Sequence, residues 1–258
     1  MELEVLYRDD DLLAIHKPPG LAVHEAPGPG SSVLRALREQ HGLAALSPVH
    51  RLDKDVSGVL LLARTTFAAR FLQKLWPSVE KRYWALCEGV PSPAQGAVDA
   101  PILENQTGKP QRLAVAFRYF AERNPGVEIP PPPAPKTSAV HPAGRPARTE
   151  YRVVEALGDR WSVLEVTPRQ GRMHQVRVHL AHLGAPLAVD ALYGRRAALT
   201  ARDAGGEGDA VLLARISLHA ACLVFPHPRE PERRITVEAP LPVDLRETLA
   251  ALRTCAGE

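Results

Sequence analysis

Residues 50–63 read HRLDKDVSGVLLLA, a stretch that joins a group of charged residues to an uninterrupted apolar run. The apolar part, residues 59–63, is bounded by Gly58 and Arg64. A short apolar run with such borders is typical of a strand buried on both faces. Polar loops beside a rigid buried strand often carry binding or catalytic groups. The segment therefore predicts a buried strand with a candidate site at its start.

Asp53 is the acid in this loop that has a cationic residue on each side, because Arg51 and Lys54 lie close to it in the sequence. A carboxylate among cations stays ionised, as a nucleophile or a general base requires. A charged turn that merely precedes a strand would have the same composition. Taken alone, the segment favours that simpler interpretation.

Strands and helices surround this segment in an irregular order. Strands are predicted from their short apolar or alternating runs at 3–7, 12–16, 59–63, 83–87, 150–156, 161–167, 216–225 and 235–239. Because no regular alternation of strand and helix appears, the pattern favours an α+β fold. We expect one catalytic domain over residues 1–258.

Four helices are predicted from apolar residues at helical spacing. The first is capped by Ser31 or Ser32 and ends near Gly42, and the last is capped by Asp244 with three leucines facing inward. A helix before Pro77 is expected to bury Phe67, Phe71, Leu72 and Leu75. The clearest periodicity is that of Met173, Val176, Leu180 and Leu183, with Gly184 as the stop signal.

Residues 124–147 differ from the rest of the chain, because eight of the 22 residues from Pro125 to Pro146 are proline. Proline removes a backbone donor, so this segment is expected to be neither a helix nor a central strand. We interpret it as an exposed, partly extended loop or insertion within the domain. A docking role for the polyproline run is the less favoured alternative.

Composition excludes several classes of protein. Apolar residues make up 45% and charged residues 24% of the 258, which is ordinary for a globular chain. No apolar run is long enough to span a membrane, and residues 1–11 lack the apolar core of a secretory signal. Three widely spaced cysteines are typical of a reducing cytosol, without a disulfide or zinc framework.

The net charge of +3 is small, but its distribution is uneven. Residues 169–196 hold five arginines and one acid, Asp190, with three histidines among them. Such a cluster can follow an RNA backbone, and it is also compatible with a solvated helix face. We place Arg172 of this cluster among the candidate phosphate contacts.

Several segments together resemble the RluA-type pseudouridine synthases. Residues 5–20, VLYRDDDLLAIHKPPG, are similar to the opening motif of that family. The other matches are HRLD at 50–53, SGVLLL at 57–62, KRY at 81–83, GRMHQVRVHL at 171–180, AHLGAP at 181–186, DALYG at 190–194 and LHA at 218–220. Motifs that keep the family's order across about residues 5 to 240 are more specific than one short pattern.

The resemblance implies an isomerase that converts a uridine of RNA to pseudouridine, with Asp53 as the essential carboxylate. By matched position, Tyr83 stacks on the target base and assists proton removal from C5, and Arg177 pairs with Asp53. Arg51 is expected to enter the RNA stack where the uridine leaves it, and Val176 to contact the base. His50 is a further candidate for contact with RNA, although a satisfied polar group is an equally open interpretation.

The resemblance also implies a mixed, largely antiparallel sheet flanked by helices and loops. The reaction needs neither electron transfer nor an activated water, so no cofactor and no metal ion is expected. The expected partner is a structured ribosomal or transfer RNA, with no membrane and no DNA, and the expected state is a cytoplasmic monomer. The chain opens on the catalytic domain without an S4 RNA-binding domain, so RNA affinity is expected from the catalytic domain itself.

Two other functions remain open from the sequence. One is a non-catalytic RNA-binding or chaperone protein that retains the fold, although intact Asp53, Tyr83 and Arg177 disfavour it. The other is a metal-dependent hydrolase built on His174, His179 and His182, whose spacing is not that of the HExxH motif. The chain also departs from the family pattern, with Val56 for Thr, His16 for Asn, Gln170 for Thr and Val189 for Gly.

Overall fold

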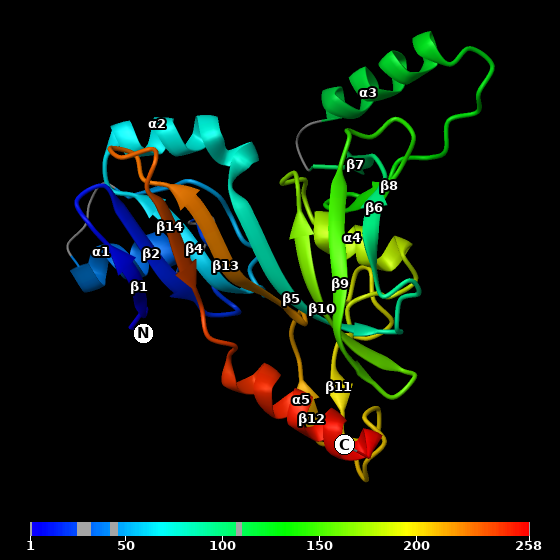
Figure 1. Cartoon of the computed structure of the whole chain (residues 1–258). Coiled ribbons are helices and arrows are strands. Elements are labelled where there is room, and N and C mark those ends of the chain that lie inside the picture. Colours follow the sequence, from blue (N-terminus) through cyan, green and yellow to red (C-terminus); the bar gives the residue numbers. More distant parts are fainter. Residues whose placement is uncertain (1, 25–31, 42–45, 107–109, 258) are drawn as a thin grey trace.

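The computed structural model describes residues 2–24, 32–41, 46–106 and 110–257. A ten-stranded mixed sheet runs through the molecule in the order β1-β2-β4-β13-β5-β10-β9-β6, with β14 beside β13 and β3 beside β4. Figure 1 shows this sheet as two halves that meet where β13 and β5 lie side by side. The α+β class and the mixed sheet predicted from the sequence are confirmed.

The strands of this sheet are β1 (Val5–Arg8), β2 (Leu12–Lys17), β3 (Ser47–Pro48), β4 (Ser57–Ala63), β5 (Glu80–Glu88), β6 (Gln95–Asp99), β9 (Arg148–Leu157), β10 (Trp161–Pro168), β13 (Leu218–Pro226) and β14 (Arg234–Glu238). Two further pairs are formed by β7 (Ile102–Glu104) with β8 (Ser138–Val140), and by β11 (Leu199–Thr200) with β12 (Val211–Leu213). The helices are α1 (Val33–His41), α2 (Thr66–Leu75), α3 (Pro110–Arg123), α4 (Gln175–His182) and α5 (Val243–Ala256), with a short 3-10 turn η1 (Trp76–Ser78) after α2.

Strand β4 is buried along its whole length, as the apolar run predicts. Its side chains alternate between two cores. Leu60 and Leu62 pack in the core that contains α1, whereas Leu61 packs in the core that contains α2. The loop that carries Asp53 is therefore attached to one of the most rigidly packed strands of the molecule.

Gly58 allows the close approach of β4 to β13. These two strands run parallel, and Gly58 lies opposite Ala220 with a φ of 123°. A Cβ atom at Gly58 would lie only 2.2 Å from the Ala220 carbonyl oxygen. Beside it, the Ser57 hydroxyl lies 3.0 Å from His219 Nδ1, and His219 Nε2 lies 3.1 Å from the Ala239 carbonyl oxygen. Glycine at 58 is thus a requirement of the sheet.

Helix α2 packs differently from the sequence prediction. Its buried residues are Ala68, Ala69 and Leu72, whereas Phe67 is 53% exposed. The alanines let the helix backbone lie close to β4. Leu72 is buried as predicted and Phe71 packs half-buried on the same core, so the prediction is wrong for Phe67. The Thr65 hydroxyl caps this helix by accepting a hydrogen bond from the Ala68 N–H.

The other two cap predictions have different outcomes. Ser32 does cap α1, because its hydroxyl accepts from the Arg35 N–H at 3.2 Å, and Ser31 and Gly42 lie outside the described residues. Asp244 is not the cap of α5, since Pro242 occupies that position. Asp244 lies in the first turn and binds the Arg215 guanidinium through both carboxylate oxygens, at 2.7 and 2.8 Å.

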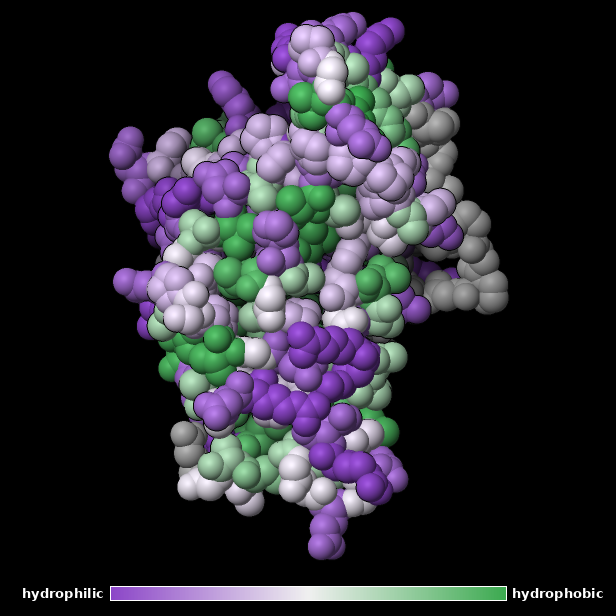
Figure 2. All heavy atoms as spheres, turned by 90° about the vertical axis from the view of Figure 1, so that its right-hand side faces the viewer, coloured by the Kyte–Doolittle hydropathy of each residue, from purple (hydrophilic) through white to green (hydrophobic). Residues whose placement is uncertain are grey.

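Helix α3 and the proline-rich segment after it, residues 110–147, form an arm. Helix α3, which the sequence did not predict, stands away from the sheet in Figure 1. Figure 2 views the molecule from that side and shows hydrophobic and hydrophilic side chains next to each other at the top, where α3 lies. Val115 and Tyr119 of this helix are both more than half exposed.

The exposed-loop prediction holds only for the first part of residues 124–147. Most side chains of residues 125–136 are exposed. From β8 onward several residues are buried, with Ser138 and His141 each 3% exposed, although Arg145 is exposed. A Cβ at Gly144 would lie 2.5 Å from the Ile102 backbone. This second part packs on β7 and α4 and belongs to the core.

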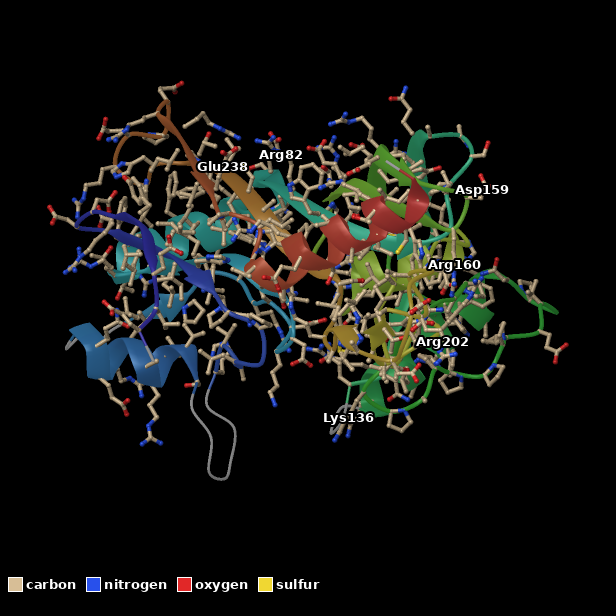
Figure 3. The ribbon with its side chains drawn as sticks, turned by 90° about the horizontal axis from the view of Figure 1, so that it is seen from below. Arg82, Lys136, Asp159, Arg160, Arg202 and Glu238 are labelled. Carbon is tan, nitrogen blue, oxygen red and sulfur yellow. The ribbon has the colours of Figure 1, made fainter. Side chains whose placement is uncertain are left out.

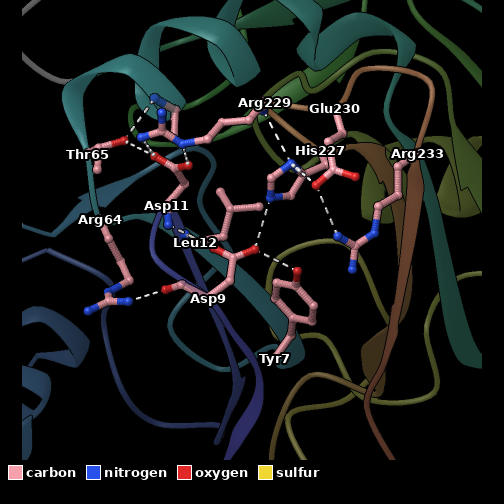
Figure 4. Close-up of polar contacts among 11 residues, drawn as sticks. Tyr7, Asp9, Asp11, Leu12, Arg64, Thr65, His227, Arg229, Glu230 and Arg233 are labelled. Atoms are coloured by element: carbon pink, nitrogen blue, oxygen red, sulfur yellow. Dashed lines mark hydrogen bonds and ion pairs between the residues drawn. The ribbon is translucent and has the colours of Figure 1, made fainter.

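The acidic turn between β1 and β2 is held by the loop that follows β13 (Figure 4). Tyr7 donates to Asp9 Oδ2 at 2.6 Å, and His227 Nε2 lies 3.2 Å from the same oxygen. Arg229 binds both oxygens of Asp11, and this pairing outweighs burial and keeps the pKa of Asp11 below its usual value. These contacts hold the β1–β2 turn against the loop between β13 and β14.

Candidate active site

A cleft of about 810 Å³ opens where the two halves of the sheet meet. The loop before β4, strand β5 and the start of α4 form its walls, and residues of the arm line its rim. The cleft is lined by all seven residues singled out from the sequence: His50, Arg51, Asp53, Tyr83, Arg172, Val176 and Arg177. A smaller hollow of about 300 Å³ adjoins it, and Arg51, Asp53, His174 and Arg177 line both.

Asp53 lies between the two hollows, and its side chain is 24% exposed. Its carbonyl oxygen accepts from the Val56 N–H at 3.1 Å, which closes a tight turn. Its carboxylate oxygen Oδ2 accepts from Arg177 Nη1 at 2.8 Å. No hydrogen bond from a described residue reaches Oδ1, so this oxygen is free to meet a reactant in the cleft.

Lys17 holds the next residue of this loop. Its fully buried ammonium group donates to the carbonyl oxygens of Pro18, Leu21 and Lys54 at 2.7–2.9 Å. Burial lowers the pKa of Lys17 to about 8, although Asp55 and Asp53 oppose the shift. Through the Lys54 carbonyl oxygen, Lys17 ties the Asp53 loop to the residues that follow β2.

Arg177 is held in place by a second carboxylate, that of Asp190. Its Nε and Nη2 donate to the two oxygens of Asp190 at 2.7 and 2.8 Å, and Arg177 and Asp190 are 5% and 1% exposed. Burial works against the charge of both residues, but their mutual hydrogen bonds outweigh it. The pKa of Asp190 is therefore lowered and that of Arg177 raised, so the guanidinium is a fixed, permanently charged partner for Asp53.

Asp190 is a functional residue that the sequence reasoning left without a role. Its Oδ1 also accepts from the N–H groups of Leu192 and Tyr193 at 2.9 and 3.2 Å. Gly194 completes this turn, because a Cβ there would lie 2.8 Å from the Asp190 carbonyl oxygen. The available signal was that Asp190 is the only acid in the basic stretch 169–196.

Tyr83 lies on β5 between β10 and β13, opposite Val166 and Ala220. Its ring is half-buried and borders the cleft. Burial, and after it the charge of Asp53, raises the pKa of Tyr83. The phenol is therefore neutral near pH 7, which favours a role for its aromatic face over a role as a proton acceptor.

The remaining candidates have unequal positions. Arg51 is exposed at the mouth of both hollows, and Val176 is a buried apolar residue of the cleft wall. Arg172 is half-buried and donates to the Pro146 carbonyl oxygen at 3.0 and 3.2 Å, so it ties the arm to the start of α4. The structure thus gives Arg172 a structural contact beside any contact with phosphate.

His50 is occupied by the protein itself. Its Nε2 accepts from the Leu61 N–H at 3.0 Å, and its ring stacks on Trp76 with centroids 4.6 Å apart. Burial lowers the pKa of His50 to about 3. His50 therefore fits the interpretation as a satisfied polar group, because its ring is neutral and has a backbone partner. A neutral ring offers no positive charge to phosphate.

Helix α4 begins at Gln175, two residues later than the apolar spacing predicts. His174 precedes it in a left-handed conformation with a φ of 57°. The histidines of the hydrolase hypothesis are separated by their contacts: His174 borders the cleft, His179 is buried against Thr149 and Ala100, and His182 is exposed. The described residues contain no group of three or more acid, histidine or cysteine side chains placed to hold a metal ion.

Comparison with known proteins identifies the class to which this cleft belongs. A family model described as RNA pseudouridylate synthase matches residues 11–182. The chain therefore belongs to the RNA pseudouridylate synthase family, as the sequence motifs predict. It is an isomerase that acts on uridine in RNA. Within the described ranges, no helix is both long enough and apolar enough to cross a membrane.

Named relatives match almost the whole chain. A ribosomal large subunit pseudouridine synthase C of Vibrio cholerae is 34% identical over 98% of this chain and 70% of its own length. The mitochondrial pseudouridylate synthase RPUSD4 of Xenopus tropicalis is 36% identical over 98% of this chain and 81% of its own. The solved structure of human RNA pseudouridylate synthase domain containing 4 is 26% identical, with a TM-score of 0.70 over 97% of this chain and 93% of that one.

Proposed function

We propose that Asp53 is the catalytic carboxylate of this pseudouridine synthase and that its substrate is a uridine of large-subunit ribosomal RNA. The observation that carries the proposal is the chain of contacts Asp190–Arg177–Asp53, which presents one carboxylate with a free oxygen to the cleft. The isomerisation breaks the N1–C1′ bond, turns the uracil and joins C5 to C1′. A proton leaves C5 and one is gained at N1, so no net oxidation occurs.

The fixed guanidinium explains how Asp53 stays ready for this step. A bidentate pair with Asp190 leaves only Nη1 of Arg177 to hold Asp53, and so it holds a single oxygen of that carboxylate. The carboxylate is already oriented before the reaction begins, so no reorganisation is needed at that moment. Its other oxygen is free to act on the uridine, by attack at C1′, by attack at C6 or by removal of the C2′ proton.

The target nucleotide must leave its RNA stack to reach Asp53. Extrusion costs a few kcal/mol, and stacking on an aromatic face returns about 1–3 kcal/mol per base. Tyr83 offers such a face beside Asp53, and Val176 adds an apolar surface in the same cleft. The exposed Arg51 lies where it can fill the space that the uridine leaves in the stack.

The choice of ribosomal RNA rests on the relatives. Three of them, from two Vibrio species and from Yersinia pestis, are named ribosomal large subunit pseudouridine synthase C and match at 33–35% identity over 96–98% of this chain. The test is to map pseudouridines in the ribosomal and transfer RNA of a deletion strain and of its parent. Loss of a site confined to transfer RNA would overturn this part of the proposal.

The role of Asp53 is tested with purified protein under single-turnover conditions. Asp53→Asn keeps the shape of the side chain but cannot act as an anion, so it should bind RNA near wild-type affinity and form no pseudouridine. Asp159→Asn, on an exposed loop labelled in Figure 3, is the matched control and should react as wild type. Substantial product from Asp53→Asn would exclude this residue as the catalytic group. Failure of the wild-type protein to form product would favour a non-catalytic RNA-binding protein.

A further inference from the structure

His174 borders both hollows next to Asp53 and has no part in the function proposed above. Its side chain is 14% exposed. The left-handed backbone turns the chain at the start of α4, and residues other than glycine adopt this conformation uncommonly, although histidine does so more often than most. Uncommon backbone conformations cluster at functional sites, where they position a side chain.

A chain of hydrogen bonds fixes the tautomer of this ring. The Ser138 N–H donates to the Tyr193 hydroxyl oxygen at 2.7 Å, and that hydroxyl lies 2.8 Å from His174 Nδ1. The phenol has one proton, and a backbone N–H can only donate. Tyr193 therefore accepts from Ser138, and among the described residues its own proton finds an acceptor only at His174 Nδ1, which assigns the ring proton to Nε2.

The ring is neutral in this arrangement. Burial lowers the pKa of His174, and the charges of Arg177 and Arg51 act in the same direction against the nearby carboxylates of Asp53 and Asp190. A neutral ring with Nδ1 occupied presents a single N–H donor at Nε2. Tyr193 is itself held under the Arg177 guanidinium, 5.0 Å from its ring centroid, so the donor has a fixed direction.

This donor lacks an acceptor within the described parts of the chain. Nε2 lies 3.8 Å from Asp53 Oδ2, which is beyond hydrogen-bond length, and Oδ2 already accepts from Arg177. Because His174 lines both hollows, a ligand bound in the cleft can supply the acceptor that the protein does not. The donor lies beside the carboxylate that reacts at the glycosidic centre, so its natural acceptor is a substrate oxygen close to that centre.

We propose that His174 Nε2–H binds an oxygen that flanks the glycosidic bond of the target uridine, either the ribose 2′-hydroxyl or the uracil O2. The proposal rests on the assignment of Asp53 as the catalytic carboxylate. The 2′-hydroxyl is carried by the carbon next to C1′, and O2 by the ring carbon next to N1, whereas O4 lies across the base. Tyr193 and Ser138 are positioning residues that act through His174.

The two oxygens would use the donor differently. When N1–C1′ breaks, negative charge develops on the departing uracil and spreads to O2, where a fixed donor stabilises the transition state more than the ground state. A bond to the 2′-hydroxyl would instead hold the ribose at the correct distance from Asp53. In both cases the contact involves an oxygen of the reacting nucleotide.

Two substitutions of His174 distinguish the role of its Nδ1 atom from that of its Nε2 atom. His174→Asn suits the left-handed backbone and can still accept from Tyr193, but it is too short to replace Nε2. His174→Gln can reach the position of Nε2 with an amide N–H. We expect a single-turnover rate about a hundredfold lower for His174→Asn and a partial recovery for His174→Gln. His182→Asn, an exposed histidine of the same helix, is the matched control and should react as wild type.

Modified RNAs identify the acceptor. The rates of wild type and His174→Asn are compared on one RNA that carries uridine, 2′-deoxyuridine or 2-thiouridine at the target position. The defect of His174→Asn should shrink to a few-fold on the analogue that lacks the contacted oxygen and persist on the other, because a double-mutant cycle isolates the pairwise contact. An equal defect on all three RNAs, or no defect, would overturn the proposal.

The result can be distinguished from failure of the proposed function. If Asp53 is not the catalytic group, Asp53→Asn forms product on unmodified RNA, whatever the behaviour of the His174 variants.

Tyr193→Phe keeps the ring under Arg177 but removes the hydroxyl that fixes the tautomer. It should lower the single-turnover rate about tenfold, which corresponds to about 1.4 kcal/mol of transition-state stabilisation, and leave RNA affinity unchanged.

Discussion

Arg177 makes three charged hydrogen bonds within the wall of the cleft, and two of them go to Asp190 rather than to Asp53. The division has a physical reason. A guanidinium that is 5% exposed needs a full counter-charge, and a carboxylate that must react cannot be held at both oxygens. Asp190 supplies the charge balance and leaves Asp53 with one oxygen free.

Replacement of Asp190 by asparagine should therefore destabilise the protein as well as inactivate it. Arg177 would keep only its single bond to the more exposed Asp53 and would lose its buried partner, and breaking a buried pair costs about 3–5 kcal/mol. The exposed pair Arg202–Asp209 provides the control, since Asp209→Asn should cost less than about 1 kcal/mol. Urea unfolding of both variants measures the difference, and similar losses for the two would contradict this account of Arg177.

The roles of single residues were only partly visible in the sequence. Asp53 could be recognised because charged neighbours and a buried strand are local features. The pairing of Arg177 with Asp53 came from the family resemblance, and the structure places the two in contact. The bond to Asp190 and the hydrogen-bond chain from Ser138 to His174 join residues distant in sequence, and no local pattern encodes them.

At the scale of elements, the sequence predicts best where one core determines the pattern. Strand β4 and helix α5 have the expected buried residues, because each packs against neighbours along its length. Helix α3 was missed, since it lies beside the proline-rich run and no described residue in it is buried. Its apolar side chains do not mark a core-facing stripe that a sequence can reveal.

The arm should tolerate change in its exposed part and not in its buried part. Replacement of residues 125–135 by a Gly/Ser link of equal length should change Tm by no more than about 2–4 °C, which corresponds to about 1 kcal/mol in a chain of this size. Gly144→Val should lower Tm much further, because its side chain would collide with the Ile102 backbone. Thermal unfolding followed by circular dichroism tests both, and equal effects would show that the two parts pack alike.

At the scale of the whole molecule, strand order is the least predictable feature. Strand β13 lies between β4 and β5 although it follows them by more than a hundred residues. The choice depends on contacts such as that of Gly58 with Ala220, which are formed only in the folded chain. This arrangement brings the Asp53 loop, Tyr83 and the start of α4 to one cleft.

Buried neutral histidines make the stability of the whole fold depend on pH. Burial lowers the pKa of His219 to about 4 and that of His50 to about 3, from an ordinary value near 6.5. Below pH 6.5 the unfolded chain takes up protons that the folded chain refuses, so stability is full above pH 6.5 and falls as the pH drops toward 4. The shift of His219 corresponds to roughly 3 kcal/mol over that window.

Urea unfolding at pH 7.5, 6 and 5 measures this loss. His219→Asn can still accept from Ser57 but has no proton to take up, so its stability should fall less between pH 7.5 and 5 than that of wild type. The acids with lowered pKa values, such as Asp11 and Asp190, lose their contribution at lower pH and leave this range undisturbed. An identical pH dependence in both proteins would mean that His219 is not held neutral.

The affinity for RNA should depend on a local concentration of charge rather than on the net charge of +3. The described residues that line the cleft include seven arginines and lysines but only two acids, Asp53 and Glu104. Four of the basic residues are exposed and available to phosphate: Arg51, Arg112, Lys136 and Arg145.

Each phosphate contact releases counterions, so log Kd should vary linearly with log salt, with a slope near 0.7–0.9 per contact. Arg145→Gln should reduce that slope by about one contact and weaken binding equally for all RNA sequences. Arg202, labelled in Figure 3, is not one of the residues that line the cleft and is paired with Asp209, so it supplies the control Arg202→Gln. Equal slopes for the two variants would show that RNA binds outside this cleft.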